Sequence, residues 1–294
     1  MKINSAQILL SLTIFSAIIS QNAPAAIYGK DNRTEIFKTE RRWQVAADSV
    51  VSLFAKQRQI PQPDGSVYLD TLQFGEALEL CSGQRFENQP IGAFCSGFLA
   101  GPDLVITAGH CFSNNEIADV KIIFGFQLNN SGQIGDSVSP QEVYSIREIV
   151  AEHVDPKGAD YAVIRLDRVV RTHRPLKIAF NDDIKIGLPV VYIGHPSGLP
   201  TKAVDGAQVL NLSPTHFEAN IDSFHGSSGG PVFDSITGEV VGILSRGYPD
   251  YDYHGDCRVP KVLEENIQNM KSGEDVTRIS AFGEILKRLI VEYQ

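Results

Sequence analysis

Short apolar runs, bounded by glycine, proline, asparagine and aspartate, follow one another along the chain from about residue 47. The runs are rich in valine, isoleucine, leucine and phenylalanine, as β-strands often are. They predict strands at residues 49–54, 94–100, 104–107, 120–126, 161–166, 189–194, 231–233 and 240–244. Many short strands separated by turn residues are typical of all-β barrels or sandwiches rather than of a parallel α/β sheet.

The C-terminal segment follows a different period. Its apolar residues are three and four positions apart, which places them on one face of a helix. They are Ile279, Phe282, Leu286, Leu289 and Tyr293. We therefore predict a helix at about residues 277–293 that packs on the body of the domain through this face.

The strand pattern has two gaps that suggest boundaries. Residues 26–46 are polar and weakly patterned, and they include the sole tryptophan, Trp43. We interpret them as an N-terminal extension or pro-segment before one domain at residues 47–294. A second gap at about residues 170–185 divides that domain into an N-terminal and a C-terminal half.

The first residues have the pattern of a secretory signal. Lys2 precedes an apolar run at residues 8–19, and Ala23-Pro24-Ala25 supplies the small residues of a cleavage site. The run is too short to span a membrane as a helix, and a buried core helix is the alternative. We expect residues 1–25 to be a signal peptide and the mature chain, without a membrane span, to be secreted or periplasmic.

The overall composition and charge of the chain exclude one class of binding partner. The chain has 294 residues, of which 43% are hydrophobic, so it can bury a sizeable core. Its formal net charge is −9, and no local basic patch offsets that charge. Binding to nucleic-acid phosphates needs a basic surface, so nucleic acid is excluded as a partner.

The expected export determines how the four cysteines are interpreted. Cys81, Cys95, Cys111 and Cys257 are an even number, and an oxidising compartment favours two disulfides over free thiols. Four cysteines allow three connectivities. No Cys-x-x-Cys pair and no other metal-ligand cluster is visible, so we expect neither a metal nor a cofactor.

A glycine-flanked serine is the strongest chemical signal. Residues 226–231 read Gly-Ser-Ser-Gly-Gly-Pro, with Ser228 in the middle. Glycine permits backbone conformations in which neighbouring N–H groups converge on one oxygen atom. Gly226 and Ser228 are therefore the candidate donors of an oxyanion hole, although a simple turn is the alternative interpretation.

A histidine and an aspartate complete the candidate chemistry. His110 follows the strand at residues 104–107 and precedes Cys111. A histidine is suited to general-base work because its usual pKa lies near working pH. Asp160 stands directly before the buried strand at residues 161–166, where it can accept from an imidazole N–H. Asp155 and Asp167 are rival carboxylates, but both have the position of turn residues.

These motifs together resemble the chymotrypsin-like (trypsin-like) serine peptidases. The resemblance rests on residues 107–111 and 226–231 with Asp160 between them, and it covers roughly residues 47–294. The order histidine, aspartate, serine is that of the family. The resemblance implies that Ser228 is the nucleophile, that His110 is the general base and that Asp160 orients His110.

Further segments are similar to the bacterial V8-like, or glutamyl endopeptidase, branch of this family. They are residues 27–33, 194–200 and 237–244. The resemblance implies two six-stranded antiparallel barrels, at about residues 47–170 and 185–275, with the catalytic triad in the cleft between them.

The resemblance also bears on the disulfides. Cys95 and Cys111 correspond to the family's pair at the histidine loop. Cys81 and Cys257 then remain, either to pair with each other or to stay free.

Substrate preference is left open by the sequence. The resemblance places the primary pocket at Asp222, Ser223, Ser245 and Gly247. Asp222 could receive a basic substrate side chain, or it could be structural. Phe224 replaces the cysteine that normally pins the pocket wall.

Two more positions depart from the family. Arg246 could attract an acidic side chain or be solvated, and Leu244 stands where glutamyl-specific enzymes carry a histidine. Ser227 replaces the aspartate that binds a new N-terminal amine in animal enzymes, so we infer that this activation switch is absent or uses other contacts.

The sequence therefore predicts a monomeric, exported serine endopeptidase acting on proteins or peptides. A catalytically silent binding or adhesion module is the first alternative, and it is disfavoured because all three candidate residues are present. An esterase-type hydrolase is the second alternative, disfavoured by the chain order of those residues.

Overall fold

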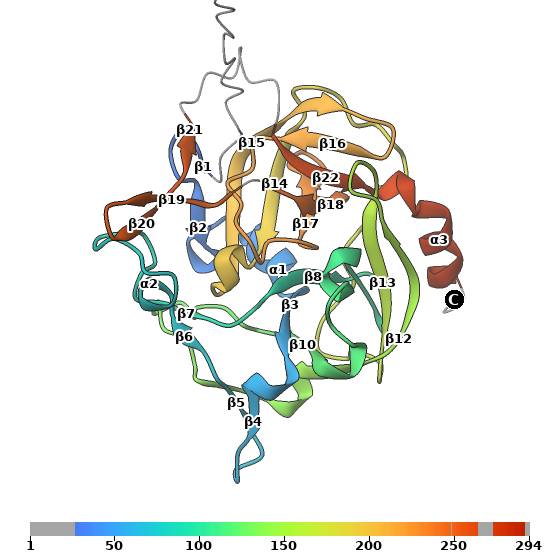
Figure 1. The fold of residues 1–294 in the computed structure, drawn as a ribbon. Coiled ribbons are helices and arrows are strands. Elements are labelled where there is room, and N and C mark those ends of the chain that lie inside the picture. The colour runs from blue at the N-terminus through green and yellow to red at the C-terminus, as the bar shows by residue number, and fades with distance from the viewer. Residues whose placement is uncertain (1–26, 248, 264–272, 292–294) are drawn as a thin grey trace, which may run out of the picture.

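The computed structural model describes residues 27–247, 249–263 and 273–291 (Figure 1). The expected signal peptide and the last position of the expected helical face, Tyr293, lie outside these residues. Among the residues described, no helix is both long and apolar enough to cross a membrane.

Six antiparallel strands close the N-terminal barrel. In the order of their pairing they are β10 (Val120–Phe124), β12 (Val143–Val154), β13 (Asp160–Leu166), β9 (Leu104–Thr107), β8 (Cys95–Leu99) and β3 (Val50–Ala55), which pairs again with β10. Valine, isoleucine and phenylalanine side chains fill the interior, with an edge-to-face contact between Phe124 and Tyr144 at a centroid distance of 5.5 Å.

A second antiparallel barrel follows in the C-terminal half. Its strands pair in the order β14 (Pro189–Gly194), β17 (Pro231–Asp234), β18 (Val240–Arg246), β22 (Glu274–Arg278), β16 (His216–Ala219) and β15 (Lys202–Leu212). Pairing of β15 with β14 closes the ring. The short strand β2 (Arg33–Glu35) pairs with the outer edge of β15.

Small elements decorate the two barrels (Figure 1). The helices are α1 (Arg41–Ala47), α2 (Phe74–Ala77) and α3 (Gly283–Val291). The remaining strands are β1 (Ile27–Tyr28), β4 (Gln59–Pro61), β5 (Val67–Leu69), β6 (Leu72–Gln73), β7 (Pro90–Ile91), β11 (Ser137–Val138), β19 (Tyr251–His254), β20 (Cys257–Pro260) and β21 (Val262–Leu263). The parallel pairing of β1 with β21 joins the start of the described chain to the C-terminal half.

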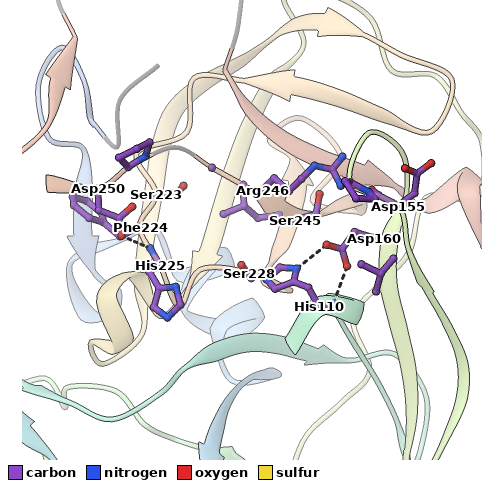
Figure 2. A pocket seen from close by; sticks show the side chains of 15 residues that line it. His110, Asp155, Asp160, Ser223, Phe224, His225, Ser228, Ser245, Arg246 and Asp250 are labelled. Atoms are coloured by element: carbon purple, nitrogen blue, oxygen red, sulfur yellow. Dashed lines mark hydrogen bonds and ion pairs between the residues drawn. The ribbon is translucent and has the colours of Figure 1, made fainter. Parts of the chain in front are cut away.

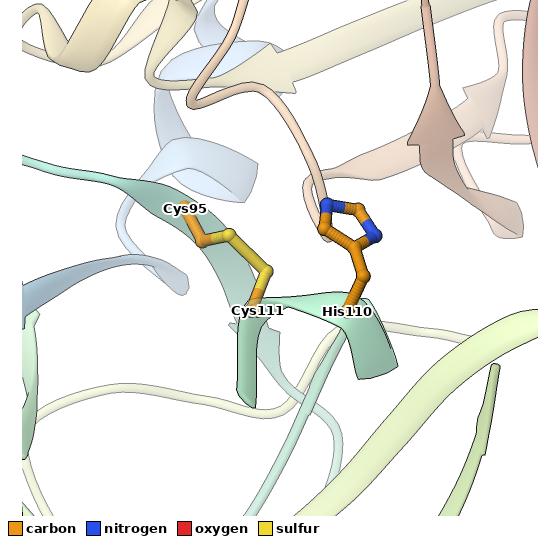
Figure 3. Close-up of side chains that lie close together, drawn as sticks. All are labelled: Cys95, His110 and Cys111. Carbon is orange, nitrogen blue, oxygen red and sulfur yellow. A yellow bond between two sulfur atoms is a disulfide. The ribbon is translucent and has the colours of Figure 1, made fainter. Parts of the chain in front are cut away.

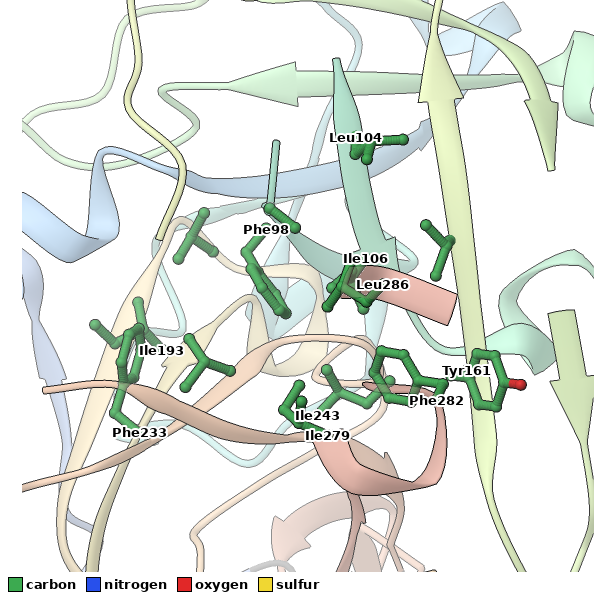
Figure 4. Packing of buried hydrophobic residues seen from close by; sticks show 14 of the residues in the cluster. Phe98, Leu104, Ile106, Tyr161, Ile193, Phe233, Ile243, Ile279, Phe282 and Leu286 are labelled. Atoms are coloured by element: carbon green, nitrogen blue, oxygen red, sulfur yellow. The ribbon is translucent and has the colours of Figure 1, made fainter. Parts of the chain in front are cut away.

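A shared apolar core holds the two barrels against each other (Figure 4). Phe98 and Ile106 come from the first barrel, and Ile193 and Ile243 come from the second; all four are fully buried. Burial of such side chains contributes roughly 1.5–3 kcal/mol each relative to exposure. The core therefore fixes the interface between the two barrels, which we call the seam, and the candidate site lies along it.

The predicted strands agree with the observed ones to within one or two residues, and the all-β, two-barrel fold class is confirmed. The C-terminal helix is shorter than predicted, because α3 begins at Gly283 rather than near residue 277. Thr277 and Arg278 belong instead to β22, where Thr277 pairs with both Ile243 and His216. At these two positions, backbone hydrogen bonding to the strands on both sides of β22 outweighs the preference for a helix that the spacing of apolar residues suggests.

The helix α3 nevertheless packs through the predicted face. Phe282, just before it, stacks on Tyr161 with a centroid distance of 4.4 Å, and Leu286 is fully buried in the shared core. Figure 4 shows these side chains between the strands and the helix. The helix therefore closes one end of the seam.

The segment that the sequence suggests as an extension is folded onto the second barrel. Trp43 is 3% exposed and packs 5.4 Å from Phe233, while β2 extends the sheet at β15. The structure thus gives residues 27–47 the packing of an integral part of the domain.

We predict that Trp43→Ala lowers the free energy of unfolding by about 3–5 kcal/mol, because it leaves a cavity in the shared core. Val45→Ala, which truncates a side chain on the same helix that is 58% exposed, should change it by less than about 0.5 kcal/mol. Urea unfolding of both variants provides the measurement. Equal midpoints for the two variants would show that this segment is not part of the cooperative core.

Candidate active site

His110 is placed by a tight turn after β9. It lies on a 3-10 turn at Gly109–Phe112. A Cβ atom on Gly109 would lie 2.7 Å from the carbonyl oxygen of His153, so no larger residue fits before the histidine. A disulfide between Cys95 and Cys111 ties the same turn to β8, as the resemblance implies (Figure 3).

Asp160 makes two hydrogen bonds with His110, one to the ring and one to the backbone. Its Oδ2 lies 2.6 Å from His110 Nδ1, and its Oδ1 accepts from the backbone N–H of His110 at 3.1 Å (Figure 2). The carboxylate is 2% exposed, so the bond is shielded from water. Because a carboxylate can only accept, Nδ1 carries the proton, and Nε2 of the neutral ring is left as a base.

The rival carboxylates are engaged elsewhere. Asp155 Oδ1 accepts from the backbone N–H of Lys157 at 2.9 Å, inside the turn before β13. Asp167 pairs with the exposed side chain of Arg168 at 3.1 Å. Of the three candidates, Asp160 is the one that the structure brings to His110.

Ser228 belongs to a loop that is fastened to the first barrel. Its carbonyl oxygen accepts from the backbone N–H of Ser96 at 2.8 Å, and Ser96 Oγ donates to the carbonyl oxygen of Gly226 at 2.8 Å. Ser228 and His110 line the same pocket (Figure 2). The single residue Ser96 on β8 therefore positions the serine loop of the second barrel.

The backbone at Gly226 requires glycine. Its φ is +91°, and a Cβ atom there would lie 2.8 Å from both Gly198 N and the carbonyl oxygen of His195. Within the described residues, no group accepts a hydrogen bond from the N–H of Gly226 or of Ser228. Both donors are thus available to a ligand oxygen atom.

The pocket beside this site contains most of the expected lining residues. His110, Asp160, Ser228, Ser223, Ser245 and Gly247 all line it, together with Leu244, Arg246 and Asp250. Asp222 does not line it. Its buried carboxylate accepts from the backbone N–H of Tyr28 at 2.8 Å and of Asn32 at 2.6 Å.

The environment of Asp222 is that of a structural group. Burial raises its pKa to about 7, while the two backbone hydrogen bonds act in the opposite direction. The side chain is 1% exposed and holds the N-terminal segment to the connection between β16 and the serine loop. The sequence had left its role open, and in the structure Asp222 is not among the residues that line the pocket.

Phe224 fixes the pocket wall without a disulfide. It is buried, and the guanidinium group of Arg33 lies 4.1 Å from its ring centroid. The second disulfide of the structure, Cys81–Cys257, lies elsewhere and joins the segment after α2 to β20.

Ser227 also has a local partner. Its Oγ accepts from the backbone N–H of Phe224 at 3.2 Å, and its backbone N–H donates to the carbonyl oxygen of the same residue. Residue 227 therefore closes its own turn. Ile27, the first described residue, donates its backbone N–H to the carbonyl oxygen of Lys261 instead.

The sequence analysis missed one buried acidic residue that lies behind the pocket without lining it. Glu274 is 1% exposed, and its carboxyl group accepts from Ser223 Oγ at 2.7 Å and from the Tyr28 hydroxyl at 3.0 Å. A Cβ atom on Gly247 would lie 2.1 Å from Glu274 Oε2, so this carboxyl stands directly behind the pocket wall. Burial raises its pKa well above the usual range.

Glu274 gave no local signal because it stands in a polar Gly-Glu-Asp stretch that has the composition of a turn. Asp250 does line the pocket, and it accepts from the backbone N–H of His225 at 2.8 Å. Burial raises the pKa of Asp250 as well.

The described residues offer one compact set of metal-ligand atoms, from Cys95, His110 and Cys111, within 4.8 Å of one another. The two sulfur atoms form the disulfide, so they cannot act as thiolate ligands. The set does not fit a metal.

Comparison with known proteins agrees with this geometry. The family model described as the trypsin-like peptidase domain matches residues 95–243, a span that runs from Cys95 on β8 through Asp160 to β18. The chain belongs to the trypsin-like peptidase family. Membership makes it a serine-type endopeptidase.

Curated relatives of this trypsin-like peptidase include trypsins from two distant sources. A trypsin of Saccharopolyspora erythraea is 33% identical over 179 residues, which is 52% of this chain and 75% of the relative. A trypsin of Sarcophaga bullata is 27% identical over 208 residues, 60% of this chain and 78% of the relative. A glutamyl endopeptidase of Bacillus licheniformis is 23% identical and covers 60% of each chain.

Solved structures share the fold. The VesB protease of Vibrio cholerae superposes with a TM-score of 0.53 at 16% identity, covering 88% of this chain and 67% of that one. The secreted serine protease VesC of the same species gives 0.51 at 19% identity, and this chain spans 45% of its length. At these identities the likeness concerns the fold alone.

We predict that Asp222→Asn reduces kcat/KM in parallel for basic, acidic and neutral substrates. The two backbone N–H groups bind different oxygen atoms of Asp222, and an amide would turn an NH2 donor toward one of them. An unsatisfied buried donor costs about 1–3 kcal/mol. Kinetics on three peptides that differ only in the residue before the cut provide the measurement. A loss confined to the basic peptide would instead identify Asp222 as a substrate-binding group.

Proposed function

We propose that this protein is an exported, monomeric endopeptidase whose catalytic triad is Ser228, His110 and Asp160. The observation that carries the proposal is the pair of hydrogen bonds that the buried Asp160 makes with His110, in the pocket that Ser228 also lines. Two disulfides support export, because such bonds persist in oxidising compartments.

The first half of the reaction forms an acyl-enzyme. Ser228 Oγ attacks the carbonyl carbon of the scissile peptide while His110 Nε2 takes its proton. Asp160 stabilises the imidazolium ion that results, and the N–H groups of Gly226 and Ser228 donate to the oxyanion. The intermediate collapses as the leaving amine takes the proton from His110.

Water completes the cycle by the same route. His110 removes a proton from the water molecule, which attacks the ester carbon on Ser228. Collapse of the second intermediate returns the proton to Ser228 Oγ and releases the carboxylic acid product. No metal or cofactor is needed at any step.

The charges around the pocket favour a basic substrate side chain rather than an acidic one. Glu274 and Asp250 place carboxyl groups at its wall, and Arg246, the nearby cation, is engaged with protein acceptors. A cationic side chain would offset the cost of burying these carboxylates, whereas a glutamate side chain would add to it. We therefore propose that the chain, although its segments resemble the V8-like branch, differs from it in primary preference.

We expect Ser228→Ala and His110→Ala each to lower kcat by about four or more orders of magnitude. The double variant should lose no more activity than either single variant, since the two residues act as one unit. Asp160→Asn should keep the fold and lower kcat by about 10⁴-fold, because an asparagine amide can stabilise the wrong tautomer of the His110 ring. Steady-state and single-turnover peptide hydrolysis measure these losses. An Asp160→Asn variant with near wild-type kcat would transfer the role to Asp155 or Asp167.

We expect wild type to cleave peptides with arginine or lysine before the cut in preference to glutamate. Glu274→Gln should lower kcat/KM for the basic peptides by about 30-fold or more, the equivalent of about 2 kcal/mol, and leave a neutral peptide nearly unchanged. Asp252→Asn, which removes one exposed carboxylate from β19, is the control of equal charge change. Preferential cleavage after glutamate by wild type would contradict the assignment.

A further inference from the structure

Arg246 forms a three-way contact at the edge of the pocket. It ends β18, and its Nε donates to Asp275 Oδ2 at 2.8 Å. Its two terminal nitrogen atoms donate to the carbonyl oxygen of Asp155 at 2.9 Å and to that of Gly158 at 2.6 Å. Figure 2 shows the guanidinium group directed toward Asp155, away from Ser228.

The two carbonyl groups belong to one turn of the other barrel. Residues 155–158 connect β12 to β13 in the N-terminal barrel, whereas Arg246 and Asp275 lie in the C-terminal barrel. Inside the turn, Gly158 N–H donates to the carbonyl oxygen of Asp155, and Asp155 N–H donates to that of Ala159. The guanidinium group therefore holds both ends of a turn that leads directly into Asp160.

Apolar packing does little to hold this turn in place. Residues 152–157 are all exposed, and burial begins only at Gly158. Hydrogen bonds from a charged donor are stronger than neutral ones, contributing roughly 1.5–3 kcal/mol each. The contact across the seam thus adds charge-assisted hydrogen bonds to the backbone bonds within the turn.

A second contact across the seam acts on the same strand start. Asp160 N–H donates to Thr277 Oγ1 at 3.0 Å, and Thr277 Oγ1 donates to Ser245 Oγ at 3.1 Å. Ser245 precedes Arg246 on β18, so two consecutive residues of one strand restrain the backbone on either side of Ala159. Their combined effect is to define where the carboxylate of Asp160 lies relative to His110.

We propose that Arg246 is a positioning residue of the catalytic site, which clamps the turn at residues 155–158 so that Asp160 stays aligned with His110. This inference rests on the proposed function of Asp160. Arg246 acts through the backbone of the other barrel and touches no reacting atom. Its guanidinium group is therefore occupied by acceptors of the protein and does not bind an acidic substrate side chain.

The test is a double-mutant cycle in the full processed protein. Arg246→Met removes all three donors and should lower kcat by about 10²-fold while KM changes by less than about threefold, since small misplacements of a catalytic group have effects of this size. Arg246→Lys, which keeps the charge and part of the donor set, should recover part of the loss. In an Asp160→Asn background, Arg246→Met should cause no further loss of kcat.

Arg168→Met provides a matched control. Arg168 likewise makes three contacts with protein acceptors, from one terminal nitrogen atom to the carbonyl groups of Pro140, Gln141 and Val143, but it does not line the pocket. It should leave kcat unchanged. If Arg246→Met does not fold, Asp275→Asn, which loosens the guanidinium group without removing it, should still lower kcat and not KM.

The outcomes separate the two proposals. An Asp160→Asn enzyme as active as wild type would overturn the proposed triad itself. An inactive Asp160→Asn enzyme, combined with an equal effect of Arg246→Met in both backgrounds, would leave the triad standing and overturn the clamp. A selective rise in KM for acidic peptides at constant kcat would show that Arg246 contacts substrate, and would overturn the clamp as well.

Discussion

The hydrogen bond between Asp160 Oδ2 and His110 Nδ1 is the interaction on which the site depends. It is 2.6 Å long, and its carboxylate partner is removed from water. In such an environment a hydrogen bond to a charged group is stronger than in water, and it fixes both the rotation and the tautomer of the ring. The second nitrogen atom of the ring then carries no proton, as the proposed role of a base toward Ser228 requires.

Neither barrel holds this arrangement alone. His110 and Asp160 come from the first barrel and Ser228 from the second, while contacts across the seam set their positions. Ser96 of the first barrel holds the serine loop, and Thr277 of the second holds the backbone of Asp160. The shared core around Phe98 and Ile243 keeps the two barrels in one relation. The packing of the two barrels against each other therefore also determines the geometry of the candidate site.

Much of this could be predicted from the sequence because the information is local. Strands such as Leu104–Thr107 and Pro189–Gly194 are apolar runs with clear turn residues at their ends, and they occur where predicted. The motifs around His110 and Ser228 are contiguous, so they are visible without a structure. The start of α3 was misplaced because pairing of Thr277 with two neighbouring strands overrides the helical period.

The roles of the charged groups around the pocket could not be predicted because their contacts join distant parts of the chain. Asp222 is satisfied by backbone groups of residues 28 and 32, which had been interpreted as lying outside the domain. Glu274 reaches Ser223 across a sequence separation of 51 residues. The partners of Arg246 lie in the other barrel, so the choice between substrate contact, solvation and a structural role depends on tertiary structure.

The most direct test of the account is covalent labelling of the processed protein with an organophosphonate, which reacts with an activated serine hydroxyl, followed by peptide mass spectrometry. The account predicts a single adduct on Ser228 that disappears when His110 is replaced by alanine. Folded, processed protein that takes up no label, or that carries the adduct on a different serine, would contradict it.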